Sequence, residues 1–144
     1  MINSDTIDLL QQCNLGIKMG VTTIDDVLDK VDNDTFRSLL SSSKEEHQRL
    51  GSETHEMLNN YQDEAKEPSP MAKTMSWMKS NIMISMKDSD NTIADLVTDG
   101  CNMGVKTLNK YLNQYTAAEE RAKDVAKKLI NMEEKLAVDI RQYL

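Results

Sequence analysis

The chain has 144 residues, a formal net charge of −7, and only 5 Gly, 2 Pro and 4% aromatic residues. This length suits one domain with one core, and the scarcity of aromatic residues and of Gly and Pro favours helices over a sheet. The acidic excess argues against binding to nucleic acid, and no run reaches the ~20 apolar residues that span a membrane. Two Cys residues without a recognisable signal peptide indicate a cytoplasmic protein with reduced thiols.

The first predicted helix covers about residues 5–31. Its apolar positions recur at steps of three and four residues and form one stripe: Ile7, Leu10, Cys13, Ile17, Gly20, Ile24, Val27 and Val31. Gly16 and Gly20 each cost the helix roughly 1 kcal/mol against Ala. Two glycines one turn apart indicate the close approach of another helix, the alternative being that neither has a structural role. Residues 32–34 form a predicted turn with a cap for the next helix.

The second predicted helix covers about residues 35–64, and its inward stripe has a polar middle. The stripe consists of Phe36, Leu40, Ser43, His47, Leu50, Thr54, Met57 and Tyr61. Polar side chains halfway along a bundle helix mark the place where bundles build their sites. The alternative is a hydrogen-bonded core histidine.

Residues 66–70 contain two prolines and end the second helix, and a shorter helix at about residues 70–87 follows. This segment is rich in Met and carries three Lys but no acidic residue before Asp88. We expect a crossover helix that returns the chain along the bundle. The alternative is a surface for a partner or a membrane, built around Met75, Trp77 and Met78.

The third predicted helix covers about residues 92–115, with Asp90 or Asn91 as its cap. Its stripe consists of Ile93, Val97, Cys101, Val105, Leu108, Leu112 and Tyr115. Thr116 and Glu119 fit a capping box for the fourth helix, which runs to the end of the chain. The stripe of this helix consists of Val125, Leu129, Met132, Leu136, Ile140 and Tyr143.

A short internal repeat links the first and third helices. Residues 13–18, with the sequence Cys-Asn-Leu-Gly-Ile-Lys, recur as Cys-Asn-Met-Gly-Val-Lys at residues 101–106. The offset of 88 residues (101 − 13) keeps the apolar positions of these two helices in phase, whereas the second and fourth helices need an offset of 89. The pairs Glu45-Glu46 and Glu133-Glu134 also match at 88 residues, but we expect them on exposed faces. The repeat predicts two similar hairpins, at about residues 5–66 and 91–144, in one domain, and chance similarity between amphipathic helices is the alternative.

Two helical hairpins joined by a crossover resemble the ferritin-like superfamily. The resemblance is closer to a bacterial group of small ferritin-like proteins of unknown function, in which a crossover segment with a Trp precedes a helix around a Cys and a Gly. The matching residues, mostly in the second half of the chain, are Trp77-Met78-Lys79, 88–91, and Gly100-Cys101-Asn102-Met103-Gly104 with Tyr111. The resemblance implies an all-α, ferritin-like four-helix bundle of two hairpins, joined by a crossover that contains an extra short helix.

Ferritin-like oxidases bind two metal ions through a Glu from each of two helices and a Glu-x-x-His from each of the other two. This chain has no Glu-x-x-His, and Cys13 and Cys101 lie about where an inward Glu is expected. We therefore assign no catalytic, cofactor-binding or metal-binding residue. The candidate core polar site is Cys13, His47 and Cys101, whose alternative is a pair of small buried hydrophobic residues and a core histidine.

The leading functional hypothesis is a noncatalytic bundle that acts through protein–protein interaction or assembly, as a homo-oligomer or with a protein partner. By resemblance, the context is a bacterial spore or a stress response. The second hypothesis is a metal-binding or redox protein that uses fewer ligands than a ferritin-like oxidase. The third is a membrane-surface or peptide binder that uses the Met-rich helix.

Overall fold

The computed structural model describes residues 4–61 and 89–144, which form four α-helices, a short 3-10 helix at the C-terminus and no strand. The elements are α1 (Ser4–Leu28), α2 (Asp34–Asn60), α4 (Asp90–Gln114), α5 (Glu120–Asp139) and η1 (Arg141–Tyr143). The predicted all-α class and the four long helices are confirmed. The predicted helix at about residues 70–87, with Met75, Trp77 and Met78, lies outside the described residues.

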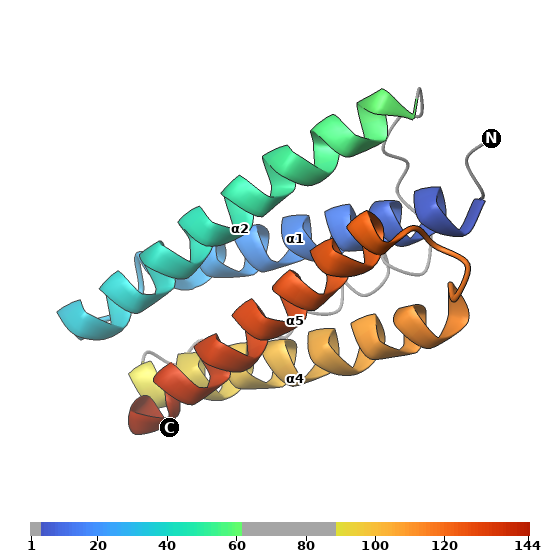
Figure 1. The fold of residues 1–144 in the computed structure, drawn as a ribbon. Coiled ribbons are helices and arrows are strands. Elements are labelled where there is room, and N and C mark those ends of the chain that lie inside the picture. The colour runs from blue at the N-terminus through green and yellow to red at the C-terminus, as the bar shows by residue number, and fades with distance from the viewer. Residues whose placement is uncertain (1–3, 62–88) are drawn as a thin grey trace.

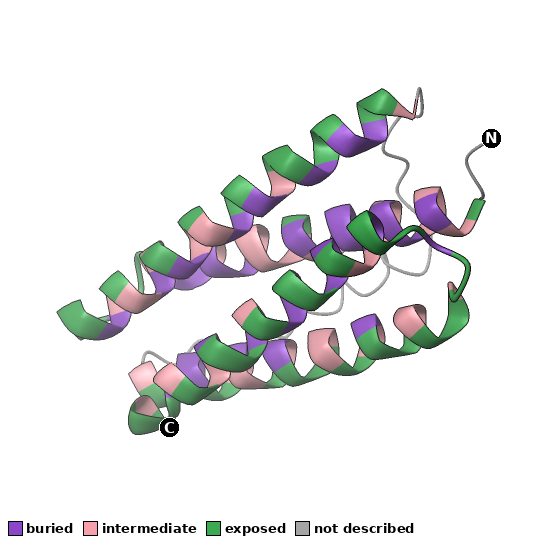
Figure 2. Cartoon of the chain, viewed as in Figure 1, coloured by how far each residue is buried: buried purple, intermediate pink, exposed green. Residues whose placement is uncertain are grey.

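The four helices form two antiparallel hairpins, α1 with α2 and α4 with α5, that pack into one bundle (Figure 1). α5 packs against both helices of the first hairpin, and α1 also packs against α4. Buried residues follow the inward faces of all four helices, as the apolar periods predict (Figure 2). Apolar burial of this kind supplies most of the stability of a helical bundle.

The core consists of two apolar clusters, one toward each end of the bundle. One contains Leu9, Cys13 and Ile17 of α1, with Leu50 and Leu129. The other gathers residues from the opposite ends of the same helices: Ile24, Val27, Leu40, Val97, Cys101 and Leu136. The middle of the bundle, between the two clusters, contains polar side chains.

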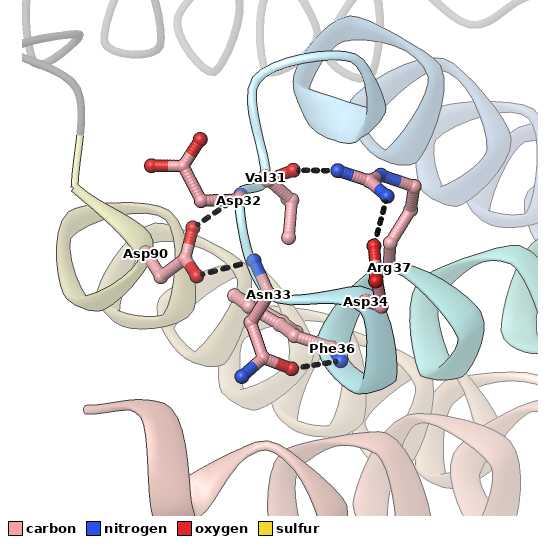
Figure 3. Close-up of polar contacts among 7 residues, drawn as sticks. All are labelled: Val31, Asp32, Asn33, Asp34, Phe36, Arg37 and Asp90. Atoms are coloured by element: carbon pink, nitrogen blue, oxygen red, sulfur yellow. Dashed lines mark hydrogen bonds and ion pairs between the residues drawn. The ribbon is translucent and has the colours of Figure 1, made fainter.

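The hairpin turns lie at opposite ends of the bundle, and each is held by the first turn of a helix from the other hairpin. At one end, the Asp90 carboxylate accepts hydrogen bonds from the backbone N–H groups of Asp32 and Asn33, both at 2.9 Å (Figure 3). At the other end, Ala117 N–H donates to Asp5 Oδ2 at 3.1 Å, and Glu119 N–H donates to Thr6 Oγ1 at 2.8 Å. α1 therefore begins where α4 ends, and the two helices are antiparallel.

These contacts also define how the two hairpins are connected. The hydroxyl of Tyr61, just after α2, donates to Glu119 Oε2 at 2.7 Å, so α2 ends beside the α4–α5 turn. α4 begins at the opposite end, beside the α1–α2 turn. Tyr61 and Ser89 consequently lie at opposite ends of the bundle.

The α1–α2 turn is capped as predicted. Asn33 is the N-cap of α2, and its side-chain oxygen accepts from Phe36 N–H at 3.0 Å (Figure 3). Arg37 pairs with Asp34 at 2.7 Å and also donates to the carbonyl of Val31, which covers the outer side of the turn. An asparagine at this position satisfies one of the free N–H groups at the start of the helix.

Two predicted caps in the second hairpin are wrong. Ser89, rather than Asp90 or Asn91, is the N-cap of α4, because the Asp90 carboxylate binds the α1–α2 turn instead. Thr116 and Glu119 form no capping box: Glu119 is itself the N-cap of α5 and makes no side-chain cap hydrogen bond. Its carboxylate accepts a hydrogen bond from the Tyr61 hydroxyl instead.

Candidate functional site

The middle of the bundle contains a buried contact between His47 of α2 and Glu133 of α5. His47 Nε2 lies 2.6 Å from Glu133 Oε1, and the two residues are 1% and 9% exposed. Each occupies an inward position of its helix, between the apolar residues that contribute to the two core clusters. The contact joins residues 86 positions apart in the sequence and links one hairpin to the other.

Both ring nitrogens of His47 face oxygen acceptors. Nδ1 lies 2.7 Å from the backbone carbonyl of Ser43, which can only accept a hydrogen bond, and Nε2 faces the carboxylate. Burial alone would lower the pKa of His47, but the hydrogen bond and the charge of Glu133, with the Ser43 carbonyl, outweigh it and raise the pKa. The geometry fits an imidazolium that donates from both nitrogens to a carboxylate and a carbonyl.

Cys101 is the third member of this polar group. It is 2% exposed, and the Glu133 carboxylate lies close enough to act on its thiol. Burial raises the pKa of Cys101, and the hydrogen bond and negative charge of Glu133 raise it further. The side chain is therefore a thiol near neutral pH, and the thiolate that nucleophilic chemistry needs is disfavoured.

Cys13, the remaining member of the candidate core polar site, lies apart from this group. It is fully buried within the apolar cluster that contains Leu9 and Leu50, and burial raises its pKa to about 12. The structure thus brings together His47 and Cys101, through Glu133, and places Cys13 in the surrounding core. Both thiols are free.

Gly20 on α1 makes room for the imidazole ring. A Cβ atom added at Gly20 would lie 2.8 Å from His47 Cδ2 and 2.9 Å from Nε2, closer than such atoms approach in proteins. We expected another helix to approach closely here, and what lies against Gly20 is the His47 side chain of α2 rather than a helix backbone. Gly16 differs, because a Cβ there would meet only Leu129 Cδ2, at an ordinary 3.5 Å.

A cavity of about 210 Å³ opens onto the polar group. Its walls come from α1 and α4, and His47, Leu129, Glu133 and Leu136 contribute from the other two helices. The two glycines of the internal repeat, Gly16 and Gly104, both line it. Most of the other lining side chains are apolar, so the polar group lies at the edge of a mainly apolar space.

The arrangement offers little to a metal ion. Among residues 4–61 and 89–144, no three His, Cys, Asp or Glu side chains are placed to bind one. A histidine binds a metal through a nitrogen lone pair, and both nitrogens of His47 are engaged with acceptors. None of the helices in these two ranges is long and apolar enough to cross a membrane.

Sequence reasoning missed Glu133 and was wrong to expect it on an exposed face. Glu133 is buried, whereas its neighbour Glu134 is exposed. The signal was the position of Glu133, four residues after Leu129 and three before Leu136, which puts it on the apolar stripe of α5. The exposed neighbour Glu134 masks this phase, because two adjacent acidic residues are typical of a solvent-facing surface.

No family model, no curated protein and no solved structure matches the chain. The ferritin-like resemblance is therefore a prediction that these comparisons leave untested.

Proposed function

We propose that the protein is a noncatalytic, ferritin-like bundle that acts by binding, as a homo-oligomer or with a protein partner. Ferritin-like bundles have one long connection that joins opposite ends of the bundle. Here the last residue of α2 and the first residue of α4 likewise lie at opposite ends. In ferritin-like oxidases, facing helices supply carboxylates and histidines to two metals at the middle of the bundle. In this chain, the His47–Glu133 ion pair occupies the middle.

The observation that carries the proposal is the double engagement of the His47 ring. With both nitrogens donating, the imidazolium has no lone pair for a metal or for a substrate proton. Glu133 already accepts from His47, and the raised pKa keeps Cys101 a thiol. Neither the His47 ring nor the Cys101 thiol is thus available for chemistry, which suits a structural or recognition role better than a catalytic one.

Metal loading tests this proposal. Purified protein would be incubated anaerobically with Fe²⁺, Mn²⁺ or Zn²⁺, desalted, and analysed for bound metal by mass spectrometry. We expect less than about one tenth of an equivalent, because binding would have to break both hydrogen bonds of His47.

The matched variants for this test are Glu133→Gln at the buried position and Glu134→Gln at the exposed one. One or two equivalents of metal that Glu133→Gln removes and Glu134→Gln leaves in place would overturn the noncatalytic proposal. They would establish the metal-binding or redox alternative in its place. Protein that remains metal-free as the wild type and as both variants supports the proposal.

The oligomeric state of the protein is tested by a separate measurement. Sedimentation velocity over a range of concentrations distinguishes a homo-oligomer from a monomer that awaits a protein partner. The membrane or peptide alternative depends on Met75, Trp77 and Met78, outside the described residues, and remains a prediction from sequence. Liposome flotation that Trp77→Asp abolishes would support it.

A further inference from the structure

The cavity between α1 and α4 points to an activity beyond this proposed function. We propose that it binds a neutral small molecule with an apolar body and one O–H or N–H group, which donates a hydrogen bond to Glu133. Phenol and indole are the simplest members of this class.

The size of the cavity sets the size of the ligand. A cavity of roughly 150 Å³ in a helical protein holds benzene. The cavity here, at about 210 Å³, has room for one ring with a substituent or for a fused bicyclic ring.

The walls set the body of the ligand. Ile24, Val97, Leu108, Leu129 and Leu136 line the cavity with branched apolar side chains. Contact with such a lining favours an apolar ligand by releasing water from both surfaces.

Two further features suit a flat ligand. Gly16 of α1 and Gly104 of α4 both line the cavity and add no side chain to its walls. Met103, 37% exposed at the cavity, can adjust its shape to what enters.

The polar atoms of the wall set the functional group. A carboxylate has about four acceptor positions, and Oε1 of Glu133 is engaged with His47 Nε2. Glu133 Oε2 lies on the side of Gly104, 3.7 Å from the position of an added Cβ. Gln12 Oε1, also in the cavity lining, is buried and has no hydrogen-bond partner within the described part of the chain. The wall therefore presents acceptors that need a donor.

The same atoms exclude charged ligands. An anion would meet the Glu133 carboxylate and the carbonyl oxygen of Gln12. A cation would add an uncompensated charge to a mainly apolar space, because His47 already neutralises Glu133. A neutral donor avoids both costs.

The experiment is a titration of ¹⁵N-labelled full-length protein with indole, followed by amide chemical shifts. Benzofuran, which has the same shape but an oxygen in place of the N–H group, is the matched probe, and benzoate is the anionic one. We expect indole to bind with a Kd of roughly 0.1–1 mM and to shift the amides of Gly16, Gly20 and Gly104. Benzofuran should bind about fivefold more weakly, the worth of one hydrogen bond, and benzoate should not bind.

Two variants locate the binding. Gly104→Leu fills the cavity from α4 and should abolish indole binding, whereas Asn102→Leu, on the exposed side of the same helix, should leave it unchanged. Gln12→Met keeps the volume and removes an acceptor without touching the ion pair, and should weaken indole binding but not benzofuran binding. Circular dichroism confirms that each variant is folded.

Three results overturn the inference: no indole binding up to about 5 mM, equal binding of indole and benzofuran, or binding that Gly104→Leu leaves intact. The first and third reject the cavity as a binding site, and the second rejects Glu133 as the anchor. None of them bears on the metal experiment, so the two proposals fail separately.

Discussion

Replacing Glu133 by Leu removes the acceptor of the central ion pair and keeps an inward side chain of similar size. His47 is 1% exposed, so its Nε2 would face apolar side chains with no partner. Breaking a buried ion pair by deleting one partner costs about 3–5 kcal/mol. His47 can give up its proton and keep the Ser43 hydrogen bond, which reduces the loss toward the ~1–3 kcal/mol of an unsatisfied buried group. We expect a loss of about 3 kcal/mol.

The second step of the experiment adds His47→Leu to Glu133→Leu. An apolar pair of similar volume often equals or exceeds a buried ion pair in stability. The double variant should therefore recover most of the loss and lie within about 1 kcal/mol of the wild type. Each single variant leaves a buried polar group alone, so the two changes are strongly nonadditive.

Urea unfolding at pH 6, followed by circular dichroism, measures all four proteins of this cycle. With a slope of about 2 kcal/mol per molar urea, a loss of 3 kcal/mol lowers the midpoint by about 1.5 M. Glu134→Leu, at the exposed neighbouring position, should change the free energy of unfolding by less than about 0.5 kcal/mol. Effects of the two central substitutions that add within 0.5 kcal/mol would refute the ion pair.

Three further predictions follow from the same contacts. Gly20→Ala should destabilise the protein by about 1–3 kcal/mol because its Cβ would displace the His47 ring, whereas Gly16→Ala should stabilise it by up to about 1 kcal/mol; thermal unfolding compares them. Because the pKa of His47 is raised in the folded state, protonation of His47 stabilises the fold fully below the unfolded pKa of about 6.5. This stabilisation is lost as the pH rises through the folded pKa, so urea midpoints should fall above pH 6.5 in the wild type but not in His47→Gln. Asp90→Ala should cost about 1–2 kcal/mol and speed hydrogen exchange at the N–H groups of Asp32 and Asn33.

The helices were predictable because their apolar period is strong, and the caps of the second hairpin were not. Ser89 and Asp90 are both good capping residues, so local rules cannot choose between them. The choice depends on the α1–α2 turn, whose N–H groups bind Asp90 across 57 and 58 residues of sequence. Glu119 is similar, because its role depends on Tyr61 of the other hairpin. Contacts between hairpins decide the helix ends, and they leave no local trace in the sequence.

The candidate site was half predictable for a related reason. His47 stands out as a polar residue on an apolar stripe, and Cys101 follows from the repeat. The repeat also implied that Cys13 is equivalent to Cys101. In the structure their surroundings differ, because Cys13 lies in an apolar cluster and Cys101 lies beside Glu133. At the offset of 89 residues, the counterpart of Glu133 is Lys44 (133 − 89), which pairs with Asp25 at 2.5 Å on the outside of the bundle. Without an inward acid opposite it, Cys13 belongs to an apolar core cluster.

The position of the ion pair indicates what it contributes besides stability. It is one polar contact between two apolar clusters, and it joins α2 of one hairpin to α5 of the other. Sliding these helices by one turn would exchange one apolar contact for another, but it would move His47 about 5.4 Å from Glu133 and leave both buried and unpaired. The pair therefore selects one alignment of the hairpins. The His47→Leu, Glu133→Leu double variant should keep its stability and lose this selection, seen as additional amide signals for α2 and α5. A single set of signals would show that apolar packing alone fixes the alignment.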